Sequence, residues 1–276
     1  MSLAEVAEET MRIVEEGGYR APSGRDVRID GLVAAAVRGT TLVRPGETDA
    51  TTFEARAGAT TIEVAPETTA RAARRLLREG HADVLALNFA SATNPGGGFL
   101  HGAIAQEEDL ARASALYPCL RTQPAYYDVH RAASSAARSA LYTDHVIHSP
   151  AVPFFRDHEL ALLEEPVVVS ILTCAAPNAG AVLQRDPEAA AAIATAFEQR
   201  VRVVLDVAAL RGHRVLVLGA WGCGVFRNDP AQVANLFAHW LGHARFRGAF
   251  ERVVFAVYDR ALRQPSLTAF RERFSD

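Results

Sequence analysis

The feature that most constrains this chain is the alternation of short apolar runs with helical segments. Residues 82–90 are almost continuously apolar, as expected for a strand that is buried on both faces of a parallel sheet. Comparable runs occupy residues 60–65, 166–172, 214–219 and 252–258. Segments with helical periodicity or helix-start signals separate these runs. The pattern predicts an α/β domain with a mostly parallel sheet between layers of helices.

Capping signals place the helices. Ser2 and Glu5 form a capping box for a helix that is expected to end near Gly17. Residues 66–79 are expected to form a helix with a proline at its start. Asp-Pro pairs at an N-cap and the first helical position predict two more helices, which cover residues 186–211 and 229–243.

Size and composition favour one domain. The chain has 276 residues, of which 49% are apolar, so it can bury a substantial core within a single domain over 1–276. The segment 118–165 is less regular, and its prolines and aromatic residues suggest excursions over the sheet. No run approaches the roughly 20 apolar residues that cross a bilayer, and the acidic amphipathic N-terminus is unlike a signal peptide. We therefore expect a soluble, cytoplasmic protein.

The basic residues exclude several chemistries, because all 29 of them are arginine. P-loop enzymes, pyridoxal phosphate enzymes and Schiff-base aldolases all need a lysine. The formal net charge of -3 argues against broad capture of a nucleic-acid backbone, so no direct DNA binding is expected. An anionic ligand must therefore be held by specific local groups.

The loop 88–110 follows a buried strand, where ligands of open α/β sheets bind. Three consecutive glycines remove every Cβ from part of this loop, although glycines also mark ordinary flexible turns. Gln106, Glu107 and Glu108 then open a helix, where acidic residues also simply complement the helix dipole. The coincidence of strand, glycine loop and paired carboxylates favours a site. Neighbouring helical positions point about 100° apart, so Glu107 and Glu108 should have different roles.

A second glycine loop, residues 219–230, lies between another buried strand and a capped helix. Its backbone N–H groups could form an anion nest that suits a diphosphate, and Phe226 could stack on or fence a ribose. An ordinary strand-to-helix turn is the alternative. The loop is not a Rossmann fingerprint, because Arg227 stands where the third glycine belongs.

Other candidates are weaker. His239 and His243 have the spacing of zinc ligands, but Trp240 occupies the place of the metalloprotease glutamate. Cys223 lies in the second loop, where a small side chain that packs under a nest is a better explanation than a nucleophile. The three cysteines are scattered and support neither a disulfide framework nor a thiolate zinc site.

The spacing of GGG, seven residues and QEE resembles the signature of poly(ADP-ribose) glycohydrolases. The surrounding NFASATNPGGGFL is similar to the shorter, bacterial branch of that family. Further segments resemble this branch, namely 9–19, 170–178, 217–230 and 253–259. The resemblance implies a three-layer α/β/α macrodomain-like fold with a mixed, mostly parallel sheet. It also implies a helical N-terminal extension over about residues 1–58, within a single catalytic domain.

The resemblance implies that Glu108 is the general acid/base and that Glu107 positions the substrate. Glu108 would protonate the leaving ribose oxygen, with its pKa raised by burial, and would then activate water. Substrate contacts are implied for the two loops, at Gly96, Gly97, Gly98, Gln106, Asn88, Asn94, Gly219, Ala220, Gly222, Cys223, Gly224, Val225 and Phe226. By analogy with macrodomains, residues 64–68 are expected to contact the adenine.

The implied activity is hydrolysis of ribose-ribose O-glycosidic bonds, mainly from the chain terminus, with release of ADP-ribose. No metal and no cofactor are implied. The implied partners are poly(ADP-ribose), ADP-ribose and poly(ADP-ribosyl)ated proteins, in a bacterial DNA damage response. Two alternatives share the fold: a non-catalytic ADP-ribose reader, which needs no QEE, and a mono-ADP-ribosyl hydrolase. A nicotinamide oxidoreductase is disfavoured by the broken glycine fingerprint.

Overall fold

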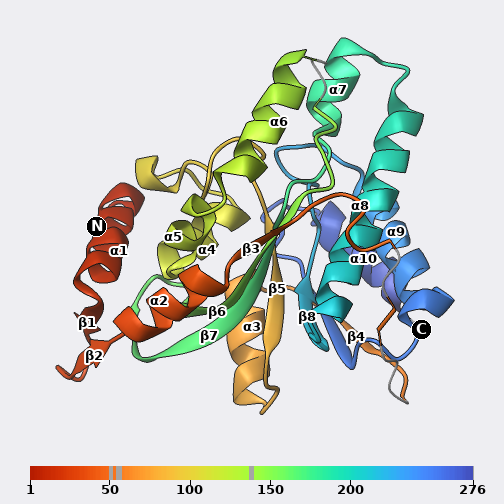
Figure 1. The fold of residues 1–276 in the computed structure, drawn as a ribbon. Helices are drawn as coiled ribbons and strands as arrows, with labels where there is room; N and C mark the ends of the chain where they lie inside the picture. The colour runs from red at the N-terminus through yellow and green to blue at the C-terminus, as the bar shows by residue number, and fades with distance from the viewer. Residues whose placement is uncertain (50–51, 54–57, 137–139, 276) are drawn as a thin grey trace.

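A seven-stranded mixed sheet forms the centre of the computed structural model, which describes residues 1–49, 52–53, 58–136 and 140–275 (Figure 1). The strand order is β3-β6-β7-β5-β8-β9-β4. Neighbouring strands from β7 to β4 run parallel, whereas β6 is antiparallel to both β7 and β3. The strands are β3 (Thr41–Val43), β4 (Thr61–Ala65), β5 (Val84–Phe89), β6 (Val146–Arg156), β7 (Leu162–Cys174), β8 (Val215–Leu218) and β9 (Arg252–Ala256). The predicted mixed, mostly parallel sheet is therefore confirmed.

Helices cover both faces of the sheet, as Figure 1 shows. One layer contains α8 (Ala190–Leu210), α9 (Pro230–Gly242) and α10 (Pro265–Phe274). The other contains α3 (Thr69–Arg78), α4 (Gln106–Ala113) and α5 (Leu116–Arg121). Successive residues of β5 alternate between two separate cores, because Leu85 and Leu87 pack under the α8 layer while Val84 and Ala86 pack under the α3 layer. Burial on both faces explains why residues 82–90 are almost uninterruptedly apolar.

The remaining elements lie around these three layers. They are α1 (Leu3–Glu16), α2 (Asp30–Gly39), α6 (Pro124–Ala136), α7 (Ala179–Arg185), the hairpin β1 (Gly18–Arg20) and β2 (Asp26–Arg28), and the short 3₁₀ helices η1 (Phe99–His101) and η2 (Ala244–Phe246). In Figure 1, α6 and α7 stand beyond the end of the sheet at the top of the view. Part of the expected N-terminal extension, residues 50–51 and 54–57, lies outside the described residues. Among the helices that the structure describes, none is both long and apolar enough to cross a bilayer.

Several predicted boundaries are confirmed by their caps. Ser2 caps α1 with the predicted capping box to Glu5, and Gly17 ends the helix with a left-handed φ of 71°. Asp229 caps α9, and the proline that follows it begins the helix.

Other boundaries were wrong. The helix expected from 66 begins at Thr69, because the Thr68 hydroxyl accepts the N–H of Arg71 and so sets the N-terminus. The helix expected from 186 begins at Ala190, because Asp186 instead ends α7.

The region between the first loop and β7 is more regular than expected. It contains α5, α6 and the long strand β6, which pairs with β7 and extends the sheet. The helix that begins at Gln106 is short. It ends at Ala113, and Tyr117 belongs to the separate helix α5, because the Ser114 hydroxyl accepts the N–H of Leu116 at the break.

Candidate active site

The carboxyl ends of the central strands bring the two glycine loops together. β5 pairs in parallel with both β7 and β8, so the loops that follow these strands leave from one edge of the sheet. A Cβ on Gly219 would lie 3.0 Å from Cζ of Phe89, which ends β5. The second loop therefore starts against the residue from which the first loop departs.

Glu108 is turned inward against the triple-glycine backbone. Its side chain is buried, with the residue 9% exposed, and Oε1 accepts the N–H of Gly98 at 3.0 Å. Gly97 has a left-handed φ of 59°, and a Cβ there would come within 2.8 Å of Cδ of Glu108 and 3.3 Å of Oε2 of Glu107. Only glycine fits this position, because the carboxylates occupy the space that a side chain would need.

Glu107 is more deeply buried and has different partners. Its Oε2 accepts the N–H of Ser91 at 2.6 Å, and its Oε1 accepts Nδ2 of Asn88 at 3.2 Å. Asn88 also contacts the Thr173 hydroxyl at the end of β7, 3.2 Å away. Burial raises the pKa of Glu107 to about 8, against the opposing effect of the Ser91 and Asn88 hydrogen bonds, and the nearby Glu108 charge raises it further. The raised pKa means that Glu107 readily holds a proton near neutral pH.

Gln106 links the strand edge to the helical layer. Its Oε1 accepts the N–H of Phe89 at 2.8 Å, and its Nε2 donates to the carbonyl of Leu87 at 2.8 Å and to the Thr69 hydroxyl at 3.0 Å. The first turn of α4 is thereby fixed to β5 and to the start of α3. The three consecutive residues 106–108 thus point to three different sets of partners, as the 100° helical spacing predicts.

The start of the first loop is held by α6. Nη1 of Arg131 donates to the carbonyl of Thr93 at 2.5 Å. The Ser91 hydroxyl accepts the N–H of Asn94 at 3.1 Å and shapes the turn before the glycines. Asn94 is exposed, whereas Asn88 is fully buried, so the two asparagines that the sequence singled out stand in different environments.

The end of the first loop rests on α1. Phe99 of η1 is buried in one cluster with Ala7 of α1 and Ala111 of α4. Thr10 donates its hydroxyl hydrogen to the carbonyl of Arg112 at 2.6 Å, and Nη1 of the fully buried Arg112 donates to the carbonyl of Ala103 at 2.7 Å. The N-terminal helix is therefore part of the support of the glycine loop.

The second loop has the features of an anion nest. Gly222 has a left-handed φ of 73°, and Asn228 donates to its carbonyl at 3.0 Å. The N–H groups of Gly224, Val225 and Phe226 donate to no group within the described part of the chain. Three consecutive free amides in a glycine turn before a helix are a structure that binds anions.

The neighbouring side chains of this loop are apolar. Trp221 is fully buried and donates from Nε1 to the carbonyl of Cys174 at 3.2 Å, which fixes the loop to β7. The Phe226 ring lies 6.1 Å from the Tyr142 ring, centroid to centroid. Burial raises the pKa of Cys223 to about 12, which disfavours a thiolate and agrees with a packing role.

Among the described residues, no group of three or more His, Cys, Asp or Glu side chains could hold a metal ion.

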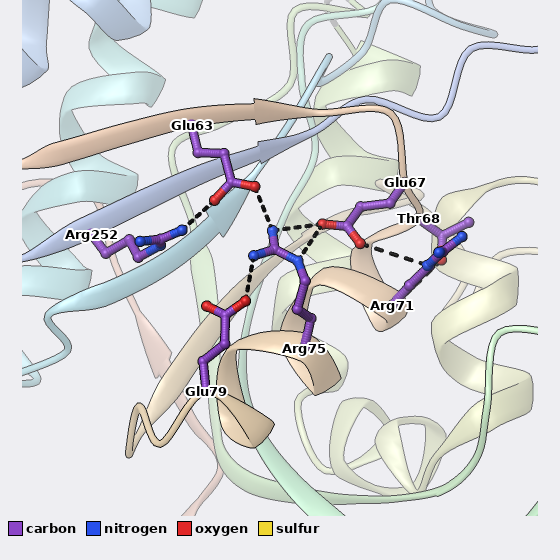
Figure 2. A network of polar contacts seen from close by, with 7 residues as sticks. All are labelled: Glu63, Glu67, Thr68, Arg71, Arg75, Glu79 and Arg252. Atoms are coloured by element: carbon purple, nitrogen blue, oxygen red, sulfur yellow. Dashed lines mark hydrogen bonds and ion pairs between the residues drawn. The ribbon is translucent and has the colours of Figure 1, made fainter.

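A network of ion pairs fixes the segment that was expected to contact adenine (Figure 2). Arg75 of α3 donates to Glu67 at 2.8 Å, to Glu63 of β4 at 2.7 Å and to Glu79 at 2.9 Å. Arg252 of β9 pairs with the other oxygen of Glu63. Residues 64–68 thus lie at the carboxyl end of β4, and their contact with adenine stays a prediction.

Several supporting residues were missed from the sequence. Ser91, Thr173, Thr69 and Arg131 act through partners 16, 85, 37 and 38 residues away in the chain, respectively. A lone Ser, Thr or Arg has no local signature for such contacts. Only the Ser91-Thr93-Asn94 turn carried a local signal, since serine commonly accepts backbone N–H groups within turns.

Comparison with known proteins gives a consistent result. Residues 7–157 match the family described as microbial-type PARG, catalytic domain, where PARG is poly(ADP-ribose) glycohydrolase. The structure is similar to that of poly(ADP-ribose) glycohydrolase from Thermomonospora curvata, with 49% sequence identity, a TM-score of 0.92 and 99% of each chain covered. None of the curated protein sequences compared with the chain matches it.

Two similar structures contain ligands. The Thermomonospora curvata enzyme bound to the inhibitor ADP-HPD is 48% identical, with a TM-score of 0.89 and 99% of each chain covered. The Deinococcus radiodurans enzyme in complex with ADP-ribose is 50% identical, with a TM-score of 0.81, and the match covers 90% of this chain and 99% of that one.

Proposed function

Because the chain belongs to the microbial-type poly(ADP-ribose) glycohydrolase family, we propose that it hydrolyses the ribose-ribose O-glycosidic bonds of poly(ADP-ribose). The cut falls mainly at the chain terminus and releases ADP-ribose. The observation that carries this proposal is the Glu108 carboxyl, which is buried against a Cβ-free backbone at the carboxyl end of β5. A ribose can approach this carboxyl closely because no side chain projects from the glycines.

In the proposed reaction, the protonated Glu108 carboxyl donates its proton to the leaving ribose oxygen as the bond to the anomeric carbon breaks. The Gly98 N–H, at 3.0 Å from Oε1, holds the carboxyl in place and stabilises the carboxylate that results. Water then adds to the oxocarbenium-like carbon and returns a proton to Glu108. One carboxyl thus serves in both halves of the reaction.

Glu107 supports this step without taking part in it. Its two oxygens are held by Ser91 and Asn88, which orient the first turn of α4 and the ribose contacts of the loop. The fully buried Asn88 acts in this proposal through Glu107, while the exposed Asn94 is free to contact the substrate. The raised pKa of Glu107 limits the charge beside Glu108 near neutral pH.

The second loop holds the diphosphate that joins the adenosine to the terminal ribose. The free amides of Gly224, Val225 and Phe226 supply donors without any cationic side chain. The half-buried Phe226 borders the ribose. The bound diphosphate lies near the developing cation and contributes to its stabilisation.

We also propose how the chain is organised and where it acts. Residues 1–276 form one catalytic domain in which α1 supports the glycine loop of residues 88–110. The chain acts in the cytoplasm on poly(ADP-ribosyl)ated proteins as part of the DNA damage response.

Glu108→Gln tests the proposed acid. The amide keeps an oxygen for the Gly98 N–H but carries no acidic proton, so ADP-ribose affinity should be unchanged while turnover falls by about 10²- to 10⁴-fold. Calorimetric titration with ADP-ribose and a hydrolysis assay measure the two quantities. Glu8→Gln, at an exposed position of α1, is the matched control. Full activity in the Glu108→Gln protein contradicts the assignment, and a wild-type protein that binds ADP-ribose without any hydrolysis identifies a reader.

A further inference from the structure

Four arginines of α3 stand in two different electrostatic environments. Arg71 and Arg75 face carboxylates, and Figure 2 shows Arg75 between Glu63, Glu67 and Glu79. Adjacent helical positions project about 100° apart, so Arg74 points away from Arg75. It lines one pocket together with residues of β7, among them Leu162 and Val167. Arg78 follows one turn after Arg74.

Arg74 and Arg78 form neither an ion pair nor a hydrogen bond with any residue that the structure describes. Arg74 is half-buried, and its pKa lies below the ordinary value because burial and the Arg78 charge both disfavour its protonated form. The charge of Asp157 offsets this only in part. The stabilisation of a helix C-terminus by a cation accounts for Arg78 but not for the half-buried Arg74. An anion between the two guanidinium groups would relieve their repulsion.

The two arginines line a cavity of about 440 Å³, which is within the usual range for sites that bind small molecules. Its apolar walls come from Pro22, Leu77, Leu162, Leu163 and Val167.

The cavity also has two carboxylates at its edge, Glu164 and Glu165. Glu164 accepts the N–H and the hydroxyl of Ser23, at 2.9 and 2.6 Å, and Glu165 pairs with Arg25 at 3.1 Å. Arg25 neutralises Glu165, whereas the uncharged Ser23 only fixes the Glu164 carboxylate in place. The two arginines therefore outweigh one uncompensated carboxylate, and the cavity keeps a net positive charge.

The cavity is distinct from the candidate active site. The first residue of α3, Thr69, contacts Gln106 at the active-site edge, whereas Arg78 is the last residue of the helix. Nine residues of α-helix separate these two positions by about 14 Å. The cavity also borders the start of β7, at the opposite end from the active-site edge.

We propose that this cavity is a second binding site for a nucleoside diphosphate, in which Arg74 and Arg78 hold the phosphates and the apolar walls receive the base and sugar. Guanidinium forks bind phosphate oxygens in pairs, which suits a diphosphate between two arginines. The group comes either from a free nucleotide or from a second part of the polymer substrate.

Calorimetric titration of the full-length protein with ADP tests this site. The wild-type protein should bind ADP at a site whose affinity falls by at least about tenfold in the Arg74→Gln/Arg78→Gln double variant. Arg71→Gln, which removes a charge from the same helix outside the cavity, should leave the ADP affinity unchanged. Identical isotherms for the wild-type and the double-variant proteins overturn the proposal.

A second measurement needs no variant. In the wild-type protein, ADP should slow hydrogen exchange of the backbone amides in residues 160–167, beside the cavity. Absence of this protection at saturating ADP also overturns the proposal.

Activity assays on poly(ADP-ribose) chains of different length identify the source of the ligand. These assays alone rest on the proposed function. If the polymer occupies the cavity, the double variant raises KM several-fold for long chains and leaves kcat and the KM for short chains unchanged. If the KM for long chains is unchanged while the ADP site is lost, the ligand is a free nucleotide. Failure of hydrolysis itself leaves the ADP titration fully interpretable.

Discussion

At residue 97 the backbone conformation and the position of the Glu108 carboxyl depend on each other. Gly97→Ala introduces a Cβ at a left-handed φ, into space that Glu108 occupies. The expected result is a fall in kcat of about 10²-fold, because a shift of about 1 Å in a catalytic group has that effect. Stability should fall by about 1–3 kcal/mol. Steady-state kinetics and thermal unfolding measure the two effects.

Gly31→Ala is the control for this substitution. Gly31 lies in α2, where an added Cβ would have no atom within 4 Å, and its φ is not left-handed. Alanine should therefore slightly stabilise the protein and leave kcat unchanged. Equal kcat values for Gly97→Ala and wild type would show that the carboxyl does not need this close backbone.

The raised pKa of Glu107 predicts how stability depends on pH. Its pKa is about 8 in the folded protein against an ordinary value of 4.5, so between these values the folded state binds more protons than the unfolded state. The free energy of unfolding should therefore fall as pH rises from about 4.5 to about 8, by on the order of a few kcal/mol, and this contribution should be constant above pH 8.

Glu107→Gln should remove this part of the pH dependence, because the amide does not titrate. Urea unfolding of both proteins at pH 5, 6.5 and 8 gives the two slopes. The variant is expected to be less stable at low pH but to show a flatter profile. Parallel profiles would show that Glu107 does not titrate in this range.

At this scale the sequence predicted where the acidic pair lies and that its two members differ. The 100° helical spacing was enough to separate Glu107 from Glu108. It was not enough to find Ser91 or Thr173, because the first contact depends on how α4 packs against the end of β5 and the second on how β7 pairs with β5. Long-range partners of this kind have no periodicity or local spacing to reveal them.

At the scale of elements, α1 supports the glycine loop of residues 88–110, and this support is testable. Ala7 of α1 is fully buried in one cluster with Phe99 of η1 and Ala111 of α4, so Ala7→Leu inserts bulk directly under η1. The overpacking should cost about 1–3 kcal/mol of stability and displace the glycine loop. We expect kcat to fall more than ADP-ribose affinity, because the substitution does not touch the diphosphate site proposed in the second loop.

Glu8→Leu adds a leucine at the adjacent, exposed position of the same helix and is the control. Kinetics and calorimetry at a temperature where both variants are folded distinguish loop displacement from unfolding. An Ala7→Leu protein with wild-type kcat would show that α1 does not position the loop.

The elements themselves were predicted best where local chemistry sets them. The capping box of α1 and the Asp-Pro start of α9 are local signals, and both are confirmed. The strand β6 was missed because Pro150 and Pro153 and a break in its register with β7 interrupt the pattern of a strand. Its pairing with β7 is a long-range interaction that the local sequence does not specify.

At the scale of the whole molecule, the parallel sheet explains why two loops more than 100 residues apart lie side by side. Parallel strands end at a common edge, so the loops after β5 and β8 must be neighbours once the strands pair. The alternation of strands and helices therefore predicted both the fold and the sheet edge from which the two glycine loops leave. The strand order was not predicted, because it depends on the tertiary packing of helices against both faces.

We propose that this chain removes ADP-ribose from poly(ADP-ribose) with Glu108 as the acid. The most direct test is to incubate the purified wild-type and Glu108→Gln proteins with poly(ADP-ribose) of defined length and to resolve the products by size over time. The wild-type protein should release ADP-ribose from the first time points, and Glu108→Gln should leave the polymer intact. Polymer that stays at full length with the wild-type protein, or equal release by both proteins, would contradict this account.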